Sequence, residues 1–208
     1  MMHKSTFTYY TVQIRGIIMK TAARRIPAIS AFILAGILPF GCAPKKPAAI
    51  RLQKDVAVFT VKSPAYQNNA ALPSRFACGT DGVSPPLTLS NLPNKTKTVA
   101  FILEDPDAPK GTYTHWIMWN WPAAKTEIPD ALPAQAKLET GAIQGTGSNG
   151  KIGYNPPCPP SGTHRYYLKA YALDSTLKLP STSDKQALLA AMQGHVIGQG
   201  MLMGTYHK

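Results

Sequence analysis

The chain has 208 residues, and its 19 prolines and 16 glycines favour turns and short strands over a helical bundle. Its 22 lysines and arginines against 10 aspartates and glutamates give a formal net charge of +12. The lysines are scattered instead of forming a stripe with interleaved aromatic residues. The charge therefore predicts a solvated basic surface and no nucleic-acid partner.

The first 41 residues are interpreted as an export signal. Arg24 and Arg25 form a positively charged start, and the apolar run over residues 26–40 follows directly. Because this run is short and contains two prolines, it is not expected to span a bilayer, and the pattern predicts a signal peptide. Met19 is the expected start of translation. The alternative interpretation is a buried helix at the start of the domain.

Cys42 follows Gly41 at the end of the apolar run, the position of the lipidated first residue of a bacterial lipoprotein. The alternative is cleavage to a soluble periplasmic form. Residues 42–54 are expected to form a tether. Subtracting the five basic residues before Cys42 from 22 leaves 17 basic against 10 acidic side chains, a net charge of +7. The expected localisation is therefore periplasmic or anchored in the membrane through the lipid on Cys42.

Residues 55–208 remain and are enough for one compact domain. They contain Cys78 and Cys158. In an oxidising compartment an even pair of cysteines favours a disulfide. Two free, half-buried thiols are the alternative.

Four segments are rich in β-branched and aromatic residues, as strands are. In chain order they are residues 56–62, 98–104, 115–121 and 165–173. In the last segment apolar residues alternate with residues such as Arg165, which is the period of a half-buried strand. Many strands with one late helix predict a mainly β fold, an antiparallel sandwich.

The one expected helix covers residues 183–192. Ser183 and Gln186 form a capping box at its start. Leu188 belongs to its single apolar stripe, and the helix is expected to end at Gly194.

Residues 145–150 read GTGSNG and fit the GxGxxG pattern of dinucleotide sites. That pattern needs a helix directly after it. Here the proline-rich residues 156–160 follow instead. No dinucleotide cofactor is therefore expected.

Two carboxylates and two imidazoles stand at the ends of apolar runs. Asp105 and Asp107 lie in EDPDAP, where two prolines stiffen the turn, His115 lies in THWIMWN, and His164 follows NPPCPPSGT. Such side chains can converge on a small pocket. A nearby carboxylate favours the charged form of an imidazole, which donates hydrogen bonds from both nitrogens. Tighter binding of an anion at mildly acidic pH is therefore expected.

The segments DPDAP, HWxxWN and PCPPxGxHRY, with GHV and GTY near the C-terminus, occur in one fixed order. Together they resemble the signature of the phosphatidylethanolamine-binding protein (PEBP) family, in its bacterial, Raf-kinase-inhibitor-like branch (the YbhB/YbcL type). The resemblance covers residues 56–206. It implies a Greek-key β-sandwich with a few peripheral helices, and a small pocket for phosphate-like or phosphoethanolamine-like anions.

The pocket residues implied by this resemblance are Asp105, Asp107, His115, Pro159, Pro160, His164 and Tyr166. Among them Asp107 is expected to serve its loop more than the ligand, because it can accept backbone hydrogen bonds there. The resemblance also places the glycine-rich residues 145–150 near the pocket rim, with amides that help to hold an anion.

The expected function is that of an exported, non-enzymatic protein that binds a phospholipid headgroup or another small anion, with no cofactor. One alternative is an interaction protein that regulates a kinase, a protease or an envelope protein through partner contacts. A second alternative is a hydrolase, although nothing around Ser161 resembles a nucleophile elbow. Two imidazoles and two carboxylates are also a workable metal set. No short ligand spacing supports a metal site, and none is expected.

Overall fold

The computed structural model describes residues 56–208. The expected signal, the lipidation site Cys42 and the tether 42–54 lie outside the described residues. Between residues 56 and 208 no helix is long and apolar enough to cross a membrane.

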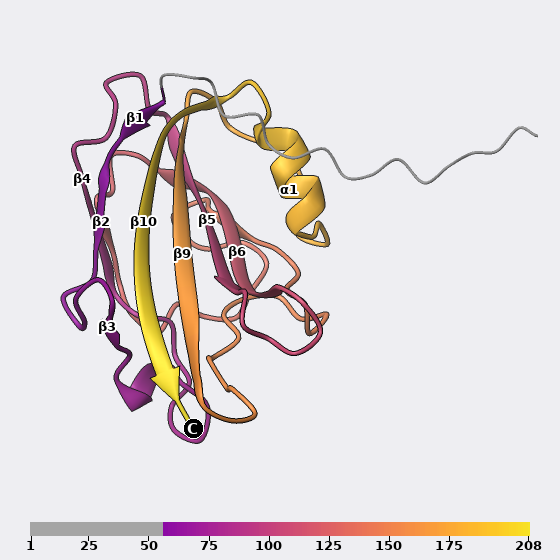
Figure 1. Ribbon diagram of the computed structural model, residues 1–208. Coiled ribbons are helices and arrows are strands. Elements are labelled where there is room, and N and C mark those ends of the chain that lie inside the picture. The colour runs from indigo at the N-terminus through magenta and orange to yellow at the C-terminus, as the bar shows by residue number, and fades with distance from the viewer. Residues whose placement is uncertain (1–55) are drawn as a thin grey trace, which may run out of the picture. The chain divides into compact units, whose positions relative to one another are not determined.

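Among residues 56–208, the larger of two sheets has seven strands in the order β1-β10-β9-β5-β6-β8, with β3 also paired to β10 (Figure 1). Its strands are β1 (Ala57–Val58), β3 (Ala70–Ala71), β5 (Thr98–Asp105), β6 (Tyr113–Pro122), β8 (Ile143–Gln144), β9 (Thr163–Leu173) and β10 (Val196–His207). The central pairs are antiparallel, as expected. However, β1 and β3 both run parallel to β10, so the sheet is mixed.

The smaller sheet contains β2 (Thr60–Lys62), β4 (Leu87–Ser90) and β7 (Glu127–Ile128). The prediction of a single strand over residues 56–62 was wrong, because the chain changes sheets at Phe59. The Phe59 amide donates to the carbonyl of Gln199 at 2.9 Å as the chain leaves β10. The Phe59 side chain is buried at this crossing.

The main core fills the space between the two sheets. Val61, Leu87 and Ile128 enter it from the smaller sheet, and Phe101 and Trp116 from the larger one. The predicted alternation in β9 is confirmed, because its even-numbered residues from 164 to 172 are buried. We call this side of the larger sheet its inner face.

Helix α1 (Lys185–Met192) covers part of the outer face, where Leu188 and Met192 pack in a second core with Ile117 and Trp119. Its N-cap is Asp184, whose carboxylate accepts from the Ala187 amide at 2.9 Å. The predicted capping box at Ser183 was therefore wrong by one residue. The Ser183 carbonyl instead accepts the Thr146 amide at 3.0 Å, which ties Ser183 to the preceding loop. A short 3-10 helix, η1 (Ser74–Phe76), lies earlier in the chain.

Candidate ligand-binding site

Three neighbouring strands bring Asp105, His115 and His164 together on the inner face. Asp105 ends β5, His115 lies near the start of β6, and His164 lies near the start of β9, on the other side of β5. Their exposed fractions are only 3%, 5% and 7%. A ligand can therefore contact only the small part of each residue that remains exposed to solvent.

A β-bulge turns His115 toward the inner face. Leu103 pairs with Trp116 and Glu104 with Thr114, so His115 is the extra residue on β6. Without the bulge, strand alternation would place His115 on the outer face, on the opposite side from Trp116. Its ring instead packs against the buried Tyr166 ring, with the ring centroids 5.3 Å apart.

Asp105 and His164 form a buried pair. His164 Nδ1 lies 2.7 Å from Asp105 Oδ2. Because an ionised carboxylate only accepts hydrogen bonds, Nδ1 carries the proton and Nε2 is left for a ligand. The other oxygen of Asp105 accepts the Asp107 amide at 2.8 Å, which fixes the carboxylate in its turn.

His115 is held by a backbone carbonyl instead of a carboxylate. Its Nδ1 lies 2.9 Å from the carbonyl oxygen of Asn155, so Nδ1 again carries the proton and Nε2 is free. The Asn155 amide donates back to the His115 carbonyl at 3.0 Å, and its side chain donates to the Tyr113 hydroxyl at 3.1 Å. The two residues therefore hold each other in a fixed orientation.

Burial lowers the pKa of His115 below its usual value, although the Asn155 carbonyl and the Asp105 charge act to raise it. The His164 charge adds to the lowering. The Asp105 carboxylate thus favours the charged form of His115, as expected, but desolvation by burial outweighs it and sets the net direction. At neutral pH this ring is neutral, with Nε2 as a hydrogen-bond acceptor.

Asp107 is occupied by Arg165 of β9. Its Oδ2 accepts from the Arg165 amide and Nε, both at 2.9 Å, and its Oδ1 accepts from Nη2 at 2.7 Å. The hydrogen bonds from Arg165 lower the pKa of Asp107 to about 2. Asp107 thus fastens the loop after β5 to the strand that carries His164.

The remaining predicted site residues differ in exposure. Tyr166 is buried, and its hydroxyl has no hydrogen-bond partner among the described residues. Burial raises its pKa, so the hydroxyl stays protonated and can donate. Pro159 is buried and Pro160 is exposed, and both lie in the loop over residues 153–162. We call this segment the proline loop.

The glycine-rich residues 145–150 use five of their six backbone amides within the fold. The amides of Thr146, Gly147 and Ser148 donate to the carbonyls of Ser183, Lys151 and Thr114 at 2.9–3.0 Å. Most donors of this loop are therefore used within the fold, and its expected anion-holding role stays a prediction. Its place beside Thr114 puts it at the edge of β6.

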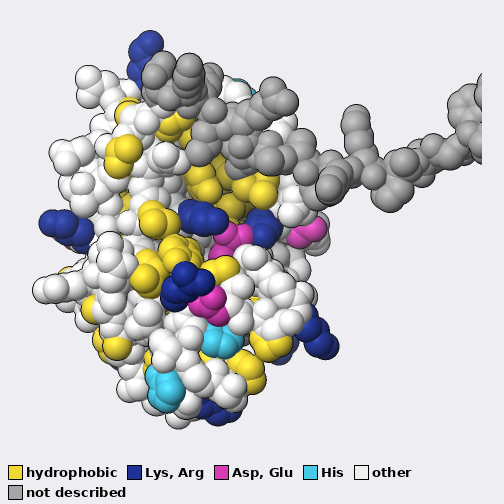
Figure 2. Space-filling model, viewed as in Figure 1, with side chains coloured by type: hydrophobic (Ala, Val, Ile, Leu, Met, Phe, Trp, Pro, Cys, Tyr) yellow, Lys and Arg dark blue, Asp and Glu magenta, His cyan; other side chains and the backbone are white. Residues whose placement is uncertain are grey.

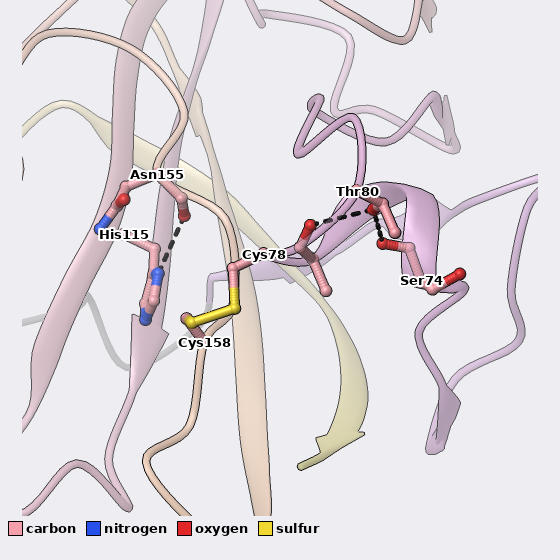
Figure 3. The surroundings of a disulfide bond; sticks show 7 residues. Ser74, Cys78, Thr80, His115, Asn155 and Cys158 are labelled. Carbon is pink, nitrogen blue, oxygen red and sulfur yellow. Dashed lines mark hydrogen bonds between the residues drawn. A yellow bond between two sulfur atoms is a disulfide. The ribbon is translucent and has the colours of Figure 1, made fainter.

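Cys78 and Cys158 form a disulfide, which confirms one of the two alternatives. The bridge spans 80 positions of the chain and joins the residues after η1 to the proline loop. In addition, the Cys78 amide donates to the Pro157 carbonyl at 2.9 Å. Figure 3 shows the bridge next to the hydrogen bond between His115 and Asn155.

A charged cluster on the outer face was not predicted from the sequence. Glu104 is 7% exposed, and its two oxygens accept from Lys169 Nζ at 2.5 Å and from Lys185 Nζ at 2.6 Å. Burial alone would raise the pKa of Glu104, but the two lysines outweigh burial and lower it. Figure 2 shows basic and acidic side chains next to one another across the middle of this face.

Two further observations on the described residues concern a separate hollow and possible metal ligands. A hollow of about 700 Å³ is lined by Trp121 and Leu138. Trp121 lies six positions from His115 along β6, about 20 Å away, so this hollow is separate from the histidine site. Within residues 56–208 no group of three or more His, Cys, Asp or Glu is placed to hold a metal ion.

Comparison with known proteins agrees with this architecture. A family model described as phosphatidylethanolamine-binding protein matches residues 62–207. A UPF0098 protein of Methanothermobacter thermautotrophicus is 40% identical over 148 residues, which cover 71% of this chain and 98% of the relative. A UPF0098 protein of Pyrococcus horikoshii is 43% identical over 150 residues, covering 70% of this chain and 75% of that protein.

Two solved structures share the fold. A phosphatidylethanolamine-binding protein homolog of Chlamydia trachomatis superposes with a TM-score of 0.68 at 38% identity, covering 73% of this chain and 98% of its own. Escherichia coli YbcL, described as a member of the mammalian PEBP family, gives a TM-score of 0.68 at 30% identity, covering 73% and 99%. The match spans all three strands that carry the histidine site. This chain belongs to the phosphatidylethanolamine-binding protein family.

Proposed function

We propose that this protein is an exported, non-enzymatic binding protein whose site at Asp105, His115 and His164 takes a small phosphate-bearing ligand such as a phospholipid headgroup. The observation that carries the proposal is the pair of oriented imidazoles. Asp105 and the Asn155 carbonyl each hold an Nδ1 proton, at 2.7 Å and 2.9 Å, so both Nε2 atoms are left for a ligand. No cofactor is needed for this role.

The charge of the site favours a ligand that also carries a positive group. With neutral imidazoles, Asp105 and Asp107 contribute two negative charges and Arg165 one positive charge. A phosphate dianion would therefore enter a site of net negative charge unless the imidazoles take up protons. A phosphoethanolamine headgroup carries its own ammonium group, whose positive charge offsets the two carboxylates while its phosphate faces the two imidazoles. We therefore propose a zwitterionic headgroup over inorganic phosphate.

Replacing either histidine with alanine is expected to weaken phosphoethanolamine binding by about tenfold or more, because each removes one hydrogen bond to a charged group. Calorimetric titration of the full chain measures the affinity. His195→Ala is the matched control, because His195 also pairs with an aspartate, Asp174, at 2.9 Å but is exposed at another position. If His115→Ala and His164→Ala bind as tightly as the control, these residues are not the site. The alternative function, an interaction protein that acts through partner contacts, would then be favoured.

Binding is expected to tighten as the pH falls from about 7.5 to about 6. The pKa of free His115 lies below its usual value of 6.5 because of burial. A bound phosphate favours the charged imidazole, so binding is coupled to proton uptake, and the affinity gain grows as the pH approaches the lowered pKa. Below about pH 6 the phosphate gains its own proton and the gain ends. Titration in buffers of different ionisation enthalpy measures the uptake, and a His115→Ala protein should take up less.

We further propose that the chain is anchored in the membrane by lipid on Cys42, which makes the ligand a neighbour of the bilayer. Two acyl signals are needed for stable anchoring. Mass spectrometry of the mature N-terminal peptide should show a diacylated or triacylated Cys42. A Cys42→Ser protein that remains in the membrane fraction would contradict the anchor but leave the binding site in place.

A further inference from the structure

The Cys78–Cys158 bridge lies beside the element that orients His115. Cys158 is three positions after Asn155, whose carbonyl lies 2.9 Å from His115 Nδ1. The next residue after Cys158 is the buried Pro159. The bridge therefore restrains the part of the proline loop that fixes one of the two imidazoles (Figure 3).

The two ends of the bridge differ in how firmly the fold holds them. On the Cys78 side, the Thr80 hydroxyl contacts the carbonyls of Ser74 and Ala77 at 2.5 Å and 3.2 Å and closes the turn after η1. This turn holds Cys78 independently of the bridge. Cys78 is accordingly the fixed anchor.

Asn155 itself is tied to His115 and Tyr113 of β6, but the part of the proline loop between Asn155 and Cys158 has few hydrogen bonds of its own. Prolines at positions 156, 157, 159 and 160 have no amide to donate. Toward η1 the loop is tied by the bridge and by two hydrogen bonds, from the Tyr154 hydroxyl to the Phe76 carbonyl at 2.7 Å and from the Cys78 amide to Pro157 at 2.9 Å. The disulfide therefore holds the proline loop in place where other segments are held by backbone hydrogen bonds.

We propose that the bridge is a redox-sensitive latch on the site: a dithiol reductant of the thioredoxin class opens it, and the Asn155 carbonyl then no longer holds His115. Cys158 is exposed and Cys78 is half-buried. A reductant thiolate attacks Cys158 Sγ, forms a mixed disulfide and releases the Cys78 thiolate, which takes up a proton. The second thiol of the reductant then resolves the mixed disulfide. Two electrons pass to the bridge, leaving two cysteine thiols and an oxidised reductant.

Release of the proline loop changes the chemistry of His115 specifically. The Asn155 carbonyl selects the tautomer with the proton on Nδ1. Without this partner both neutral tautomers become populated, and the Nε2 lone pair is no longer presented in a fixed direction. His164 is held by Asp105 at the end of β5, which is not part of the two segments that the bridge joins. The loss of affinity that follows rests on the proposed function, but the change of tautomer does not.

Nitrogen NMR of the imidazole rings tests the latch in the full chain carrying Cys42→Ser, in which only the bridge can change its redox state. With the bridge intact, His115 and His164 should both show the Nδ1-protonated tautomer. After reduction with dithiothreitol, His115 should become a mixture while His164 keeps its tautomer as the internal control. Phosphoethanolamine affinity should fall by about tenfold, the value of one charge-assisted hydrogen bond, and reoxidation should restore it.

The proposal is overturned if His115 keeps a pure Nδ1 tautomer although both thiols have become alkylatable. If the oxidised chain binds no phosphoethanolamine, the proposed function fails. The change in the His115 tautomer on reduction still tests whether the bridge acts as a latch. If the reduced chain unfolds, a second variant tests the latch with the bridge intact. Pro156→Gly with Pro157→Gly keeps the bridge but slackens the segment between Cys158 and Asn155. It should give a mixed tautomer at His115, and an unchanged His115 would again overturn the latch.

Discussion

Replacing both Lys169 and Lys185 with methionine is expected to lower the free energy of unfolding by about 3–5 kcal/mol, because it leaves the buried carboxylate of Glu104 without a partner. Lys169 is 42% exposed and Lys185 is 20% exposed. The solvent screens the more exposed ion pair more strongly, so Lys185→Met alone should cost more than Lys169→Met alone. Urea unfolding at neutral pH measures all three proteins.

The matched control adds Glu104→Met to the double substitution, which removes the buried charge. Replacement of a whole buried cluster by apolar residues is often neutral, so this protein should recover most of the lost stability.

The pH dependence of stability gives an independent check. The pKa of Glu104 is lowered in the fold from 4.5, so the wild type loses stability as the pH falls below that value. The double variant should instead regain stability in acid, because its carboxyl is easier to bury when protonated. A wild-type-like double variant would show that the lysines do not compensate Glu104.

Removing the Cys78–Cys158 bridge with serine at both positions is expected to lower the free energy of unfolding by roughly 4.5 kcal/mol. The bridge closes a loop of 80 positions in the unfolded chain, and the chain-entropy relation gives this value for a loop of that length. The substitution acts on the unfolded state, so the urea dependence should steepen as the unfolded chain expands. Unfolding in Cys42→Ser protein, oxidised and reduced, provides the comparison. A loss below about 1 kcal/mol would show that the native fold strains against the bridge.

Much of the fold follows from local sequence patterns. The strands near residues 98–104 and 165–173 were predicted because β-branched and alternating residues act over a few positions. The break at Phe59 could not be predicted, since it depends on the Gln199 carbonyl far along the chain. The parallel pairing of β1 and β3 depends on β10 in the same way.

The site was predictable in part, through the family motifs that contain Asp105, His115 and His164. Two of its features leave no signal in the sequence. A bulge places His115 on the inner face, and bulges follow from the register of two strands rather than from residue type. The partner of His115 is the backbone carbonyl of Asn155, which any residue would supply. Arg165 was visible in the HRY motif, but only the structure pairs it with Asp107.

The position of β10 has a consequence for the order in which the chain can fold. Both β1 and β3, near the beginning of the described chain, have β10 as their sheet partner, and β10 is its last strand. Pairing over such sequence distances is slow, because the intervening chain must close first. A ribosome or a secretion channel that releases the chain from its N-terminus would therefore hold these early strands unpaired until the last residues emerge. The larger sheet therefore gains β1 and β3 only after β10 has been released.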